Sequence, residues 1–406
     1  MRTEGDNMIG LRRQNRAAVL LALQRHGGLS RKRLASMLHL TPAAMTKIAA
    51  ELIGEGLIFE DGSVPSGSAG RREIVLRLND QSISALGVSI GLGKASVSAV
   101  RADGTVLFFE TVPLPIRAPA ERTVQLLSDH LMKQIQRCKQ SFGRLLGVGI
   151  AVRGVVGADG RTVKTSFDAL DTEDFPICDS FEAQTGYPAV LSNNVRALLS
   201  AELYLSRSEK PESVFFLRCG SGIGAAFSDG DEIMEGDRRQ CAEIGHIPVI
   251  RHGGKPCHCG KSGCLETIAS PAAIQAEAQA ILSESETPLL WKLTNGGSNA
   301  VTTARVLQAA RGGDEGALRI ADRAAQALSD ALKSVVYLMD PGKIVLYGKI
   351  FEQPYFLSRL RTEMDVGVDA AHATPMEKSR FNLTLEEKAA GLLYINHFYQ
   401  NGGMEE

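Results

Sequence analysis

The chain of 406 residues is long enough for two or three domains, each with a substantial hydrophobic core. Apolar residues make up 44% and charged residues 22%, the ordinary balance of a soluble globular protein. No apolar run approaches the ~20 residues needed to cross a bilayer, and Met1 to Leu11 lacks the apolar stretch of a signal peptide. We therefore predict a cytoplasmic protein with no membrane partner.

The net charge of −1 conceals an uneven distribution. Residues 1–78 contain 12 Lys and Arg against 7 Asp and Glu, whereas acidic residues are in excess over the remainder. A basic head on an acidic body favours nucleic-acid binding at the N-terminal end only.

Residues 1–78 have the pattern of a winged helix-turn-helix domain. Helices are predicted over residues 15–26, 30–38 and 41–55, and strands over 57–59 and 74–78. Gly27 stops the first helix, and Ser30 is a suitable N-cap for the second. Thr41 followed by Pro42 opens the third, because threonine caps a helix and proline fits its first position.

The third helix is the candidate DNA-reading element. Met45, Ile48 and Leu52 recur at helical spacing and should face the core. The outward-facing residues at its start would let the backbone approach the major groove: Ala43, Ala44, Thr46 and Lys47. Arg71 and Arg72 fall at the predicted wing tip, where they suit phosphate or minor-groove contacts. The alternative is a plain packing unit with a solvated arginine pair.

After a linker at 79–84, residues 85–406 alternate between strands and helices. Two similar units, at 86–112 and 214–234, each contain a strand, a glycine turn, a second strand and an Asp-Gly turn. Helices are predicted over 120–139, 195–205 and 317–338. This repetition predicts a duplicated, two-lobed α/β fold with a cleft between the lobes.

The strongest chemical signal is a cysteine-rich segment that runs from Cys257 to Glu266 and follows a nearby histidine. Three thiolates within eight residues, with that histidine, form a set suited to tetrahedral zinc. Gly260 and Gly263 would let the short loop fold tightly. The predicted ligands are His246, Cys257, Cys259 and Cys264.

A closed set of four ligands leaves no position for a reactive water, so the predicted zinc is structural. His252 and His258 are close enough in sequence to be rivals for the histidine position. The alternative is a loop of three unligated cysteines.

With these motifs the chain resembles the ROK family, named for repressors, open reading frames and kinases. The segments Glu243–His246 (ExGH) and Cys257–Glu266 (CxCGxxGCxE) match its two signatures, and a winged helix is typical of its repressor branch. The resemblance implies an actin/sugar-kinase-like (ribonuclease H-like) fold for residues 85–406. It also implies that His246 ligates zinc through one ring nitrogen and contacts sugar with the other. Glu243 and Glu266 would accept hydrogen bonds from sugar hydroxyls.

The sequence departs from the family's kinases at three places. Ser89-Ile-Gly91-Leu-Gly93 stands where kinases have Asp-x-Gly-x-Thr, so a metal-organising acid and a hydroxyl are missing. Asn194 replaces the catalytic aspartate, and an amide cannot act as a general base. Residues 347–349 (Tyr-Gly-Lys) correspond to a glycine-rich loop of the kinases, and their larger side chains would occupy space where a nucleotide would lie. We therefore predict that the chain is not an enzyme.

Asn193 and Asn194 could still hydrogen-bond a sugar, since binding requires no proton transfer. The alternative is that Asn194 only caps the following helix. Both interpretations are compatible with the sequence.

The sequence thus predicts a sugar-responsive transcriptional repressor, a homodimer or homotetramer on double-stranded DNA. Its effector would be a small carbohydrate or a sugar phosphate bound in the cleft between the lobes. Two rivals are a sugar kinase with an appended DNA-binding head and a zinc-responsive regulator.

Overall fold

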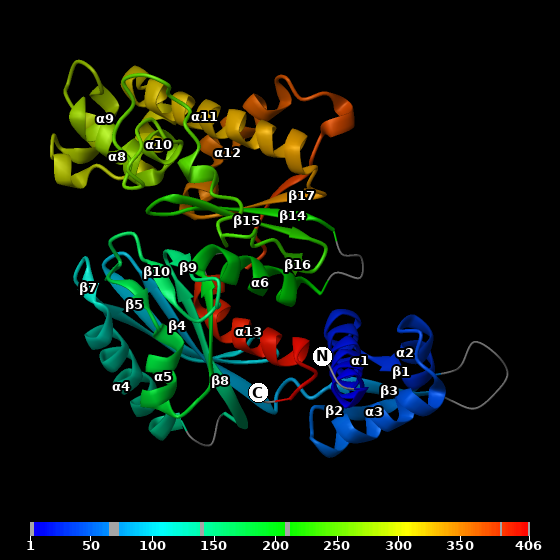
Figure 1. Cartoon of the computed structure of the whole chain (residues 1–406). Helices are drawn as coiled ribbons and strands as arrows, with labels where there is room; N and C mark the ends of the chain where they lie inside the picture. The colour runs from blue at the N-terminus through cyan, green and yellow to red at the C-terminus, as the bar shows by residue number, and fades with distance from the viewer. Residues whose placement is uncertain (1–3, 65–72, 139–141, 208–211, 382–383, 405–406) are drawn as a thin grey trace. The chain divides into compact units, whose positions relative to one another are not determined.

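The computed structural model describes residues 4–64, 73–138, 142–207, 212–381 and 384–404. The chain divides into two compact units, one formed by Met1–Lys210 with Thr384–Glu406 and the other by Pro211–Leu383 (Figure 1). Among the described helices, none combines the length and the hydropathy that spanning a membrane requires.

The first unit begins with a three-helix head and a small sheet. Its elements are α1 (Glu4–His26), β1 (Leu29–Ser30), α2 (Arg31–Met37), α3 (Pro42–Gly54), β2 (Ile58–Val64) and β3 (Glu73–Leu78). The antiparallel sheet has the order β1-β3-β2, and this arrangement confirms the predicted winged helix-turn-helix. Helix α1 begins at Glu4 and not at Asn15, because the residues before its apolar stripe include two glycines and show no helical periodicity, so they gave no helix signal in the sequence.

The helix starts in the head follow the predicted caps. The Arg33 amide donates to Ser30 Oγ at 3.2 Å, and the Ala44 amide donates to Thr41 Oγ1 at the same distance. The apolar stripe of α3 is buried as predicted, at Met45, Ile48 and Leu52. These contacts fix α3 against the head and leave its other face exposed.

A five-stranded sheet of order β13-β8-β4-β5-β6 follows the head. Its strands are β4 (Ile83–Gly91), β5 (Lys94–Arg101), β6 (Val106–Pro113), β8 (Arg144–Val152) and β13 (Ala189–Asn193). Helices α4 (Ala120–Cys138) and α5 (Ile177–Thr185) share its core. Short pairings complete the unit: β7 (Ala118–Pro119) with β11 (Leu170–Asp171), and β9 (Val155–Val156) and β12 (Glu173–Phe175) with β10 (Val163–Thr165).

The strand β4 starts within the expected linker. Both Ile83 and Ser84 are buried, and Ser84 Oγ donates to the Phe142 carbonyl at 2.7 Å. The linker between β3 and β4 therefore consists of residues 79–82 only.

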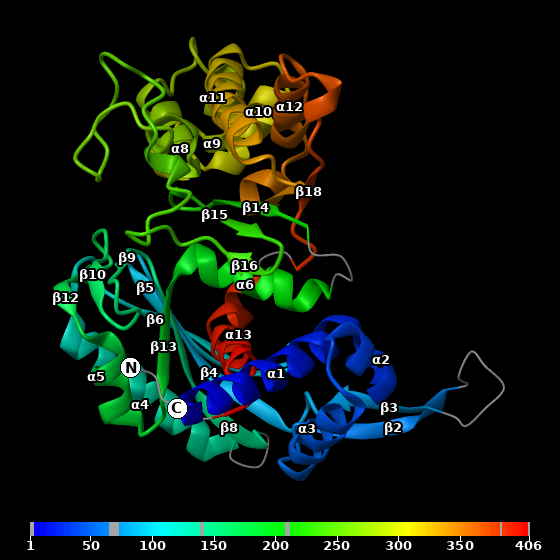
Figure 2. The ribbon, with the colours of Figure 1, turned by 45° about the vertical axis from the view of Figure 1, so that its right-hand side comes forward.

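The opposite face of this sheet is covered by α6 (Asn194–Ser206) and α13 (Leu385–Gln400) (Figure 2). Glycines on the sheet allow the backbone of α13 to approach closely. A Cβ at Gly149 would lie 1.7 Å from the Ala390 carbonyl oxygen, and one at Gly87 would lie 2.7 Å from the Gly391 nitrogen. The core of the unit therefore requires residues from both ends of the chain.

The second unit contains a five-stranded sheet of order β16-β15-β14-β17-β18. Its strands are β14 (Val214–Cys219), β15 (Ile223–Asp229), β16 (Glu232–Ile233), β17 (Lys343–Tyr347) and β18 (Met376–Lys378). The helices are α7 (Glu266–Ala269), α8 (Pro271–Ala280), α9 (Pro288–Thr294), α10 (Thr303–Arg311), α11 (Glu315–Met339) and α12 (Pro354–Asp365). Helices α8 to α12 gather on one side of the sheet and enclose its core (Figures 1 and 2).

The predicted duplication is visible in the two sheets. Strands β4 and β5 form an antiparallel hairpin beside the parallel strand β8. Strands β14 and β15 do the same beside the parallel strand β17. Each unit thus carries one copy of the same α/β motif.

Candidate functional site

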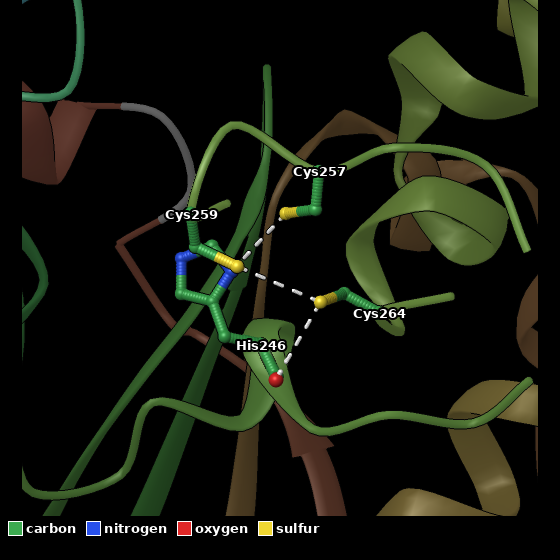
Figure 3. A group of neighbouring side chains, drawn as sticks. All are labelled: His246, Cys257, Cys259 and Cys264. Carbon is green, nitrogen blue, oxygen red and sulfur yellow. Dashed lines mark hydrogen bonds between the residues drawn. The ribbon is translucent and has the colours of Figure 1, made fainter. Parts of the chain in front are cut away.

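The structure brings His246, Cys257, Cys259 and Cys264 together in the second unit. His246 ends the 3-10 turn η2 (Ile244–His246), and the cysteines lie on the loop before α7. Their candidate ligand atoms all lie within 4.8 Å of one another. Figure 3 shows the sulfurs and the imidazole directed toward a common centre, which could hold a metal ion.

The loop that carries the thiols is tight because of its glycines. The Cys257 amide donates to the Lys261 carbonyl at 2.7 Å, which closes one turn. Gly260 and Gly263 have φ of +84° and +74°, a conformation that side chains rarely adopt. A Cβ at Gly263 would also lie 2.1 Å from the Ile250 carbonyl oxygen. The glycines have the role expected from the sequence.

The thiols differ in acidity. Burial raises the pKa of the Cys257 thiol to about 12, and burial also raises the pKa of Cys264. At Cys259 burial acts in the same direction, but hydrogen bonds from the Lys261 amide and the other thiols outweigh it and lower the pKa. Metal ligation requires thiolates, so a bound metal would have to displace the protons of the thiols whose pKa is raised.

The three histidines considered as metal ligands differ in their neighbours. Only His246 belongs to the group that contains all three cysteines. His246 Nδ1 lies 3.5 Å from Cys257 Sγ, so Nδ1 is the ring nitrogen beside this thiol. His258 belongs to a second possible group, formed with His246, Cys257 and Glu266. His252 belongs to neither group within the described residues.

Glu266 begins α7 and its carboxylate is held at both oxygens. Oε2 accepts the Ile223 amide at 2.8 Å, at the turn between β14 and β15. Oε1 lies 2.8 Å from His258 Nε2. From the sequence, His258 was interpreted only as a rival zinc ligand, and its contact with Glu266 was not predicted. A polar residue between the first two cysteines was the only signal.

Glu243 immediately precedes η2 and is half-buried. The His246 amide donates to the Glu243 carbonyl at 3.0 Å, so the two residues share one short turn. The three residues with an implied sugar contact in this unit, Glu243, His246 and Glu266, therefore lie on the turn and the loop around the thiol cluster.

Asn193 and Asn194 belong to the first unit, where β13 meets α6. The helix cap is Asn193 and not Asn194: Asn193 Oδ1 accepts the Val195 amide at 2.8 Å. Asn193 Nδ2 donates to the Gly154 carbonyl at 2.9 Å. Asn194 is half-buried in the first helical turn, and within the described residues its side chain makes no hydrogen bond. The cap falls one residue earlier because Asn193 alone has the extended backbone of a cap, with ψ of 144°.

Two positions correspond to nucleotide-binding loops in the family's kinases, and one of them, Tyr347, differs from the expectation. Tyr347, predicted to add bulk, is 2% exposed, and its ring packs against Phe216 with centroids 5.7 Å apart. Its side chain is therefore buried, but on the face of the sheet opposite the core that Ile344 and Leu346 join. Ser89 pairs with Ser96 in the hairpin of the first unit, where it offers no carboxylate.

The candidate DNA interface is the start of α3. Ala43, Thr46 and Lys47 are exposed and Ala44 is half-buried. Thr46 Oγ1 donates to the Pro42 carbonyl at 2.8 Å, which leaves the hydroxyl oxygen as an acceptor. Arg71 and Arg72 lie outside the described residues.

Two family models match the chain. The ROK family matches residues 85–393, about three quarters of the sequence. The chain belongs to the ROK family. The MarR family matches residues 14–59, which lie in the helical head. This ROK protein is therefore a sugar-kinase-like domain with an N-terminal DNA-binding domain.

Similar proteins indicate how the ROK domain is used. The N-acetylglucosamine repressor of Escherichia coli O6:H1 is 30% identical over 345 residues, 83% of this chain and 81% of that protein. A solved ROK family transcriptional regulator, described as a homolog of the E. coli MLC protein, covers 97% of both chains with 22% identity and a TM-score of 0.82. A ROK family glucokinase from Streptomyces griseus, solved with glucose and AMPPNP, covers 76% of this chain and 98% of its own, with 23% identity and a TM-score of 0.64.

The repressors match 83 to 86% of the chain, which is more than the ROK domain alone, and several such relatives are named as repressors. With the DNA-binding head, these similarities identify the chain as a sugar-responsive transcriptional repressor and not an enzyme.

Proposed function

We propose that a small carbohydrate or sugar phosphate releases this repressor from a palindromic operator. N-acetylglucosamine is the first candidate effector, because a relative with 30% identity is named as the repressor of that sugar. The observation that carries the proposal is Asn194, a half-buried amide at the start of α6 where kinases of the family have a catalytic carboxylate. This residue can bind a hydroxyl but cannot deprotonate it.

The proposed effector contacts are Asn193, Asn194, Glu243, His246 and Glu266. Glu266 supports this assignment best, since its two oxygens together accept two bonds and retain lone pairs for hydroxyl donors. Asn194 supports it because its side-chain amide makes no hydrogen bond to the residues that the structure describes. The Asn193 side chain already donates to the Gly154 carbonyl and accepts from the Val195 amide, so it can form fewer hydrogen bonds with the effector.

The proposed metal is a structural Zn²⁺ held by His246, Cys257, Cys259 and Cys264. One imidazole and three thiolates are the donor types that zinc prefers, and the closed set leaves no coordination site for catalysis. The ion would fix the loop that leads into Glu266 and the turn that carries Glu243.

The proposed DNA contacts are Ala43, Ala44, Thr46 and Lys47 at the start of α3, together with Arg71 and Arg72, which lie outside the described residues. A symmetric operator requires paired heads, so the proposal includes a homodimer or homotetramer in the cytoplasm.

The test is operator binding during a titration with N-acetylglucosamine, glucose and their 6-phosphates. Wild-type protein should release the operator with at least one of them. Glu266→Ala removes an acceptor for desolvated hydroxyls, which should cost about 1–3 kcal/mol, or a factor of roughly 5 to 150 in effector affinity. Its operator affinity without effector should remain that of the wild type, because α3 lies in the other unit.

The matched control is Glu284→Ala, which removes an exposed carboxylate from the same unit. It should respond to the effector as the wild type does. An equal response from Glu266→Ala would mean that the effector binds elsewhere and would contradict the proposed site.

A further inference from the structure

The carboxylate of Glu266 is oriented by two anchors on different segments. The first is the turn between β14 and β15, where the Ile223 amide donates to Oε2. The carboxylate lies so close to this turn that a Cβ at Gly222 would be 2.1 Å from Oε2. This anchor restrains one oxygen and leaves the carboxylate free to pivot about it.

The second anchor removes that freedom. His258 Nε2 lies 2.8 Å from Oε1, and the side chains of His258 and Glu266 are only 25% and 13% exposed. A bond to a carboxylate in such a position is stronger than a solvent-exposed one. Both oxygens are then fixed, so the remaining lone pairs point in defined directions.

His258 is itself restrained. It lies between Cys257 and Cys259, and its ring meets the His246 ring edge to face, with centroids 4.9 Å apart and planes at 88°. The orientation of Glu266 therefore depends on the loop that carries the thiols. A side chain held by packing and by its backbone neighbours is a better anchor than a free one.

We propose that His258 is a positioning residue that holds the Glu266 carboxylate in the orientation that accepts sugar hydroxyls. The inference rests on the proposed function, because it assumes that Glu266 contacts the effector. His258 lowers the ordering cost of effector binding and contacts no sugar itself. It also links effector affinity to an intact thiol loop.

The experiment uses the full chain and whichever of N-acetylglucosamine, glucose and their 6-phosphates binds the wild type most tightly. His258→Leu removes the donor and should weaken binding about tenfold. His258→Gln keeps a donor of similar reach and should stay within about threefold of the wild type. A double-mutant cycle with Glu266→Ala should show that His258→Leu has no further effect once the carboxylate is gone.

Zinc content, measured on each variant, separates positioning from ligation. Unchanged zinc with weakened binding and glutamine rescue supports the inference. Loss of zinc in His258→Leu would show that His258 is a metal ligand and would overturn it. So would unchanged binding in His258→Leu, or equal losses in the Leu and Gln variants. A wild type that binds none of the four sugars would overturn the proposed effectors and the inference together, whereas an unaffected His258→Leu beside a weakened Glu266→Ala would overturn the inference alone.

Discussion

Arg16 Nη1 donates to Glu55 Oε1 at 2.8 Å, and this contact joins the middle of α1 to the C-cap residue of α3. The Arg16 side chain is only 1% exposed. Its Nε also donates to the Gly402 carbonyl at 2.8 Å. One buried cation thus connects α3, the proposed DNA-reading helix, to the segment that follows α13.

Replacing Arg16 by Met should therefore destabilise the head. The variant keeps most of the apolar stem but leaves the Gly402 carbonyl without its donor. Because Glu55 is 39% exposed and can be hydrated, we expect a loss of about 2 kcal/mol in unfolding free energy, not the larger cost of a fully buried pair. Urea unfolding measures this.

The control for that variant is Arg12→Met, on the same helix. Arg12 is 53% exposed and pairs with Glu51, so its loss should cost under about 1 kcal/mol. Equal losses in the two variants would show that burial of Arg16 has no special role.

Lys47→Ala should weaken operator binding and reduce the slope of affinity against salt by about one unit, as expected for one lost phosphate contact. Fluorescence anisotropy at several salt concentrations measures both quantities. Lys292→Ala, which removes an exposed lysine from α9, should change neither. An unchanged salt slope in Lys47→Ala would place this lysine outside the DNA interface.

Purified protein should contain about one zinc per chain, and Cys259→Ser should lose most of it. Cys259 is one of the four proposed ligands, and loss of a thiolate weakens metal binding and the folding of the loop that depends on it. Thermal unfolding should then occur at a lower temperature. Cys241→Ser changes a half-buried cysteine outside the cluster and should keep its metal. Metal-free wild type, prepared without chelator, would disprove the zinc site.

Gly222→Ala should weaken effector binding about tenfold while zinc content stays unchanged. The added methyl group would occupy the space of Glu266 Oε2 and displace the carboxylate from the Ile223 amide. Gly54→Ala is the matched control, because a Cβ there meets nothing within 4 Å. Calorimetric titration compares the two. If both bind equally, the close approach of Gly222 is irrelevant to recognition.

Neither the wild type nor Asn194→Asp should form ADP in a sugar-dependent manner. The substitution restores a carboxylate, but Ser89 still stands where kinases have an acid that organises Mg²⁺. A coupled assay with the same four compounds tests this. Phosphorylation by either protein would show that the remaining groups suffice for catalysis.

Local signals made much of the head predictable from the sequence. The caps at Ser30 and Thr41 and the stripe of Met45, Ile48 and Leu52 involve residues three or four apart, and the structure confirms them. The spacing of cysteines likewise anticipated the cluster at His246, because a short glycine-containing loop has few ways to fold.

Contacts between distant segments were not predictable. The Asn193 cap depends on where β13 ends, and β13 is set by its pairing with β8. The contact of His258 with Glu266 depends on the path of the whole loop. Tyr347 was predicted to add bulk near a nucleotide, but the sequence could not show that its ring is buried against Phe216.

The position of α13 has a consequence for how the protein is made. The segment that completes the first unit comes after the whole second unit in the chain, since residues 211–383 intervene. During synthesis, the sheet around Gly87 and Gly149 therefore lacks one covering layer until α13 emerges. The second unit is continuous and can fold as soon as it has been synthesised. A truncated chain without α13 would then expose apolar strands beside an already folded unit, and it would be a target for chaperones and proteases before it could occupy an operator.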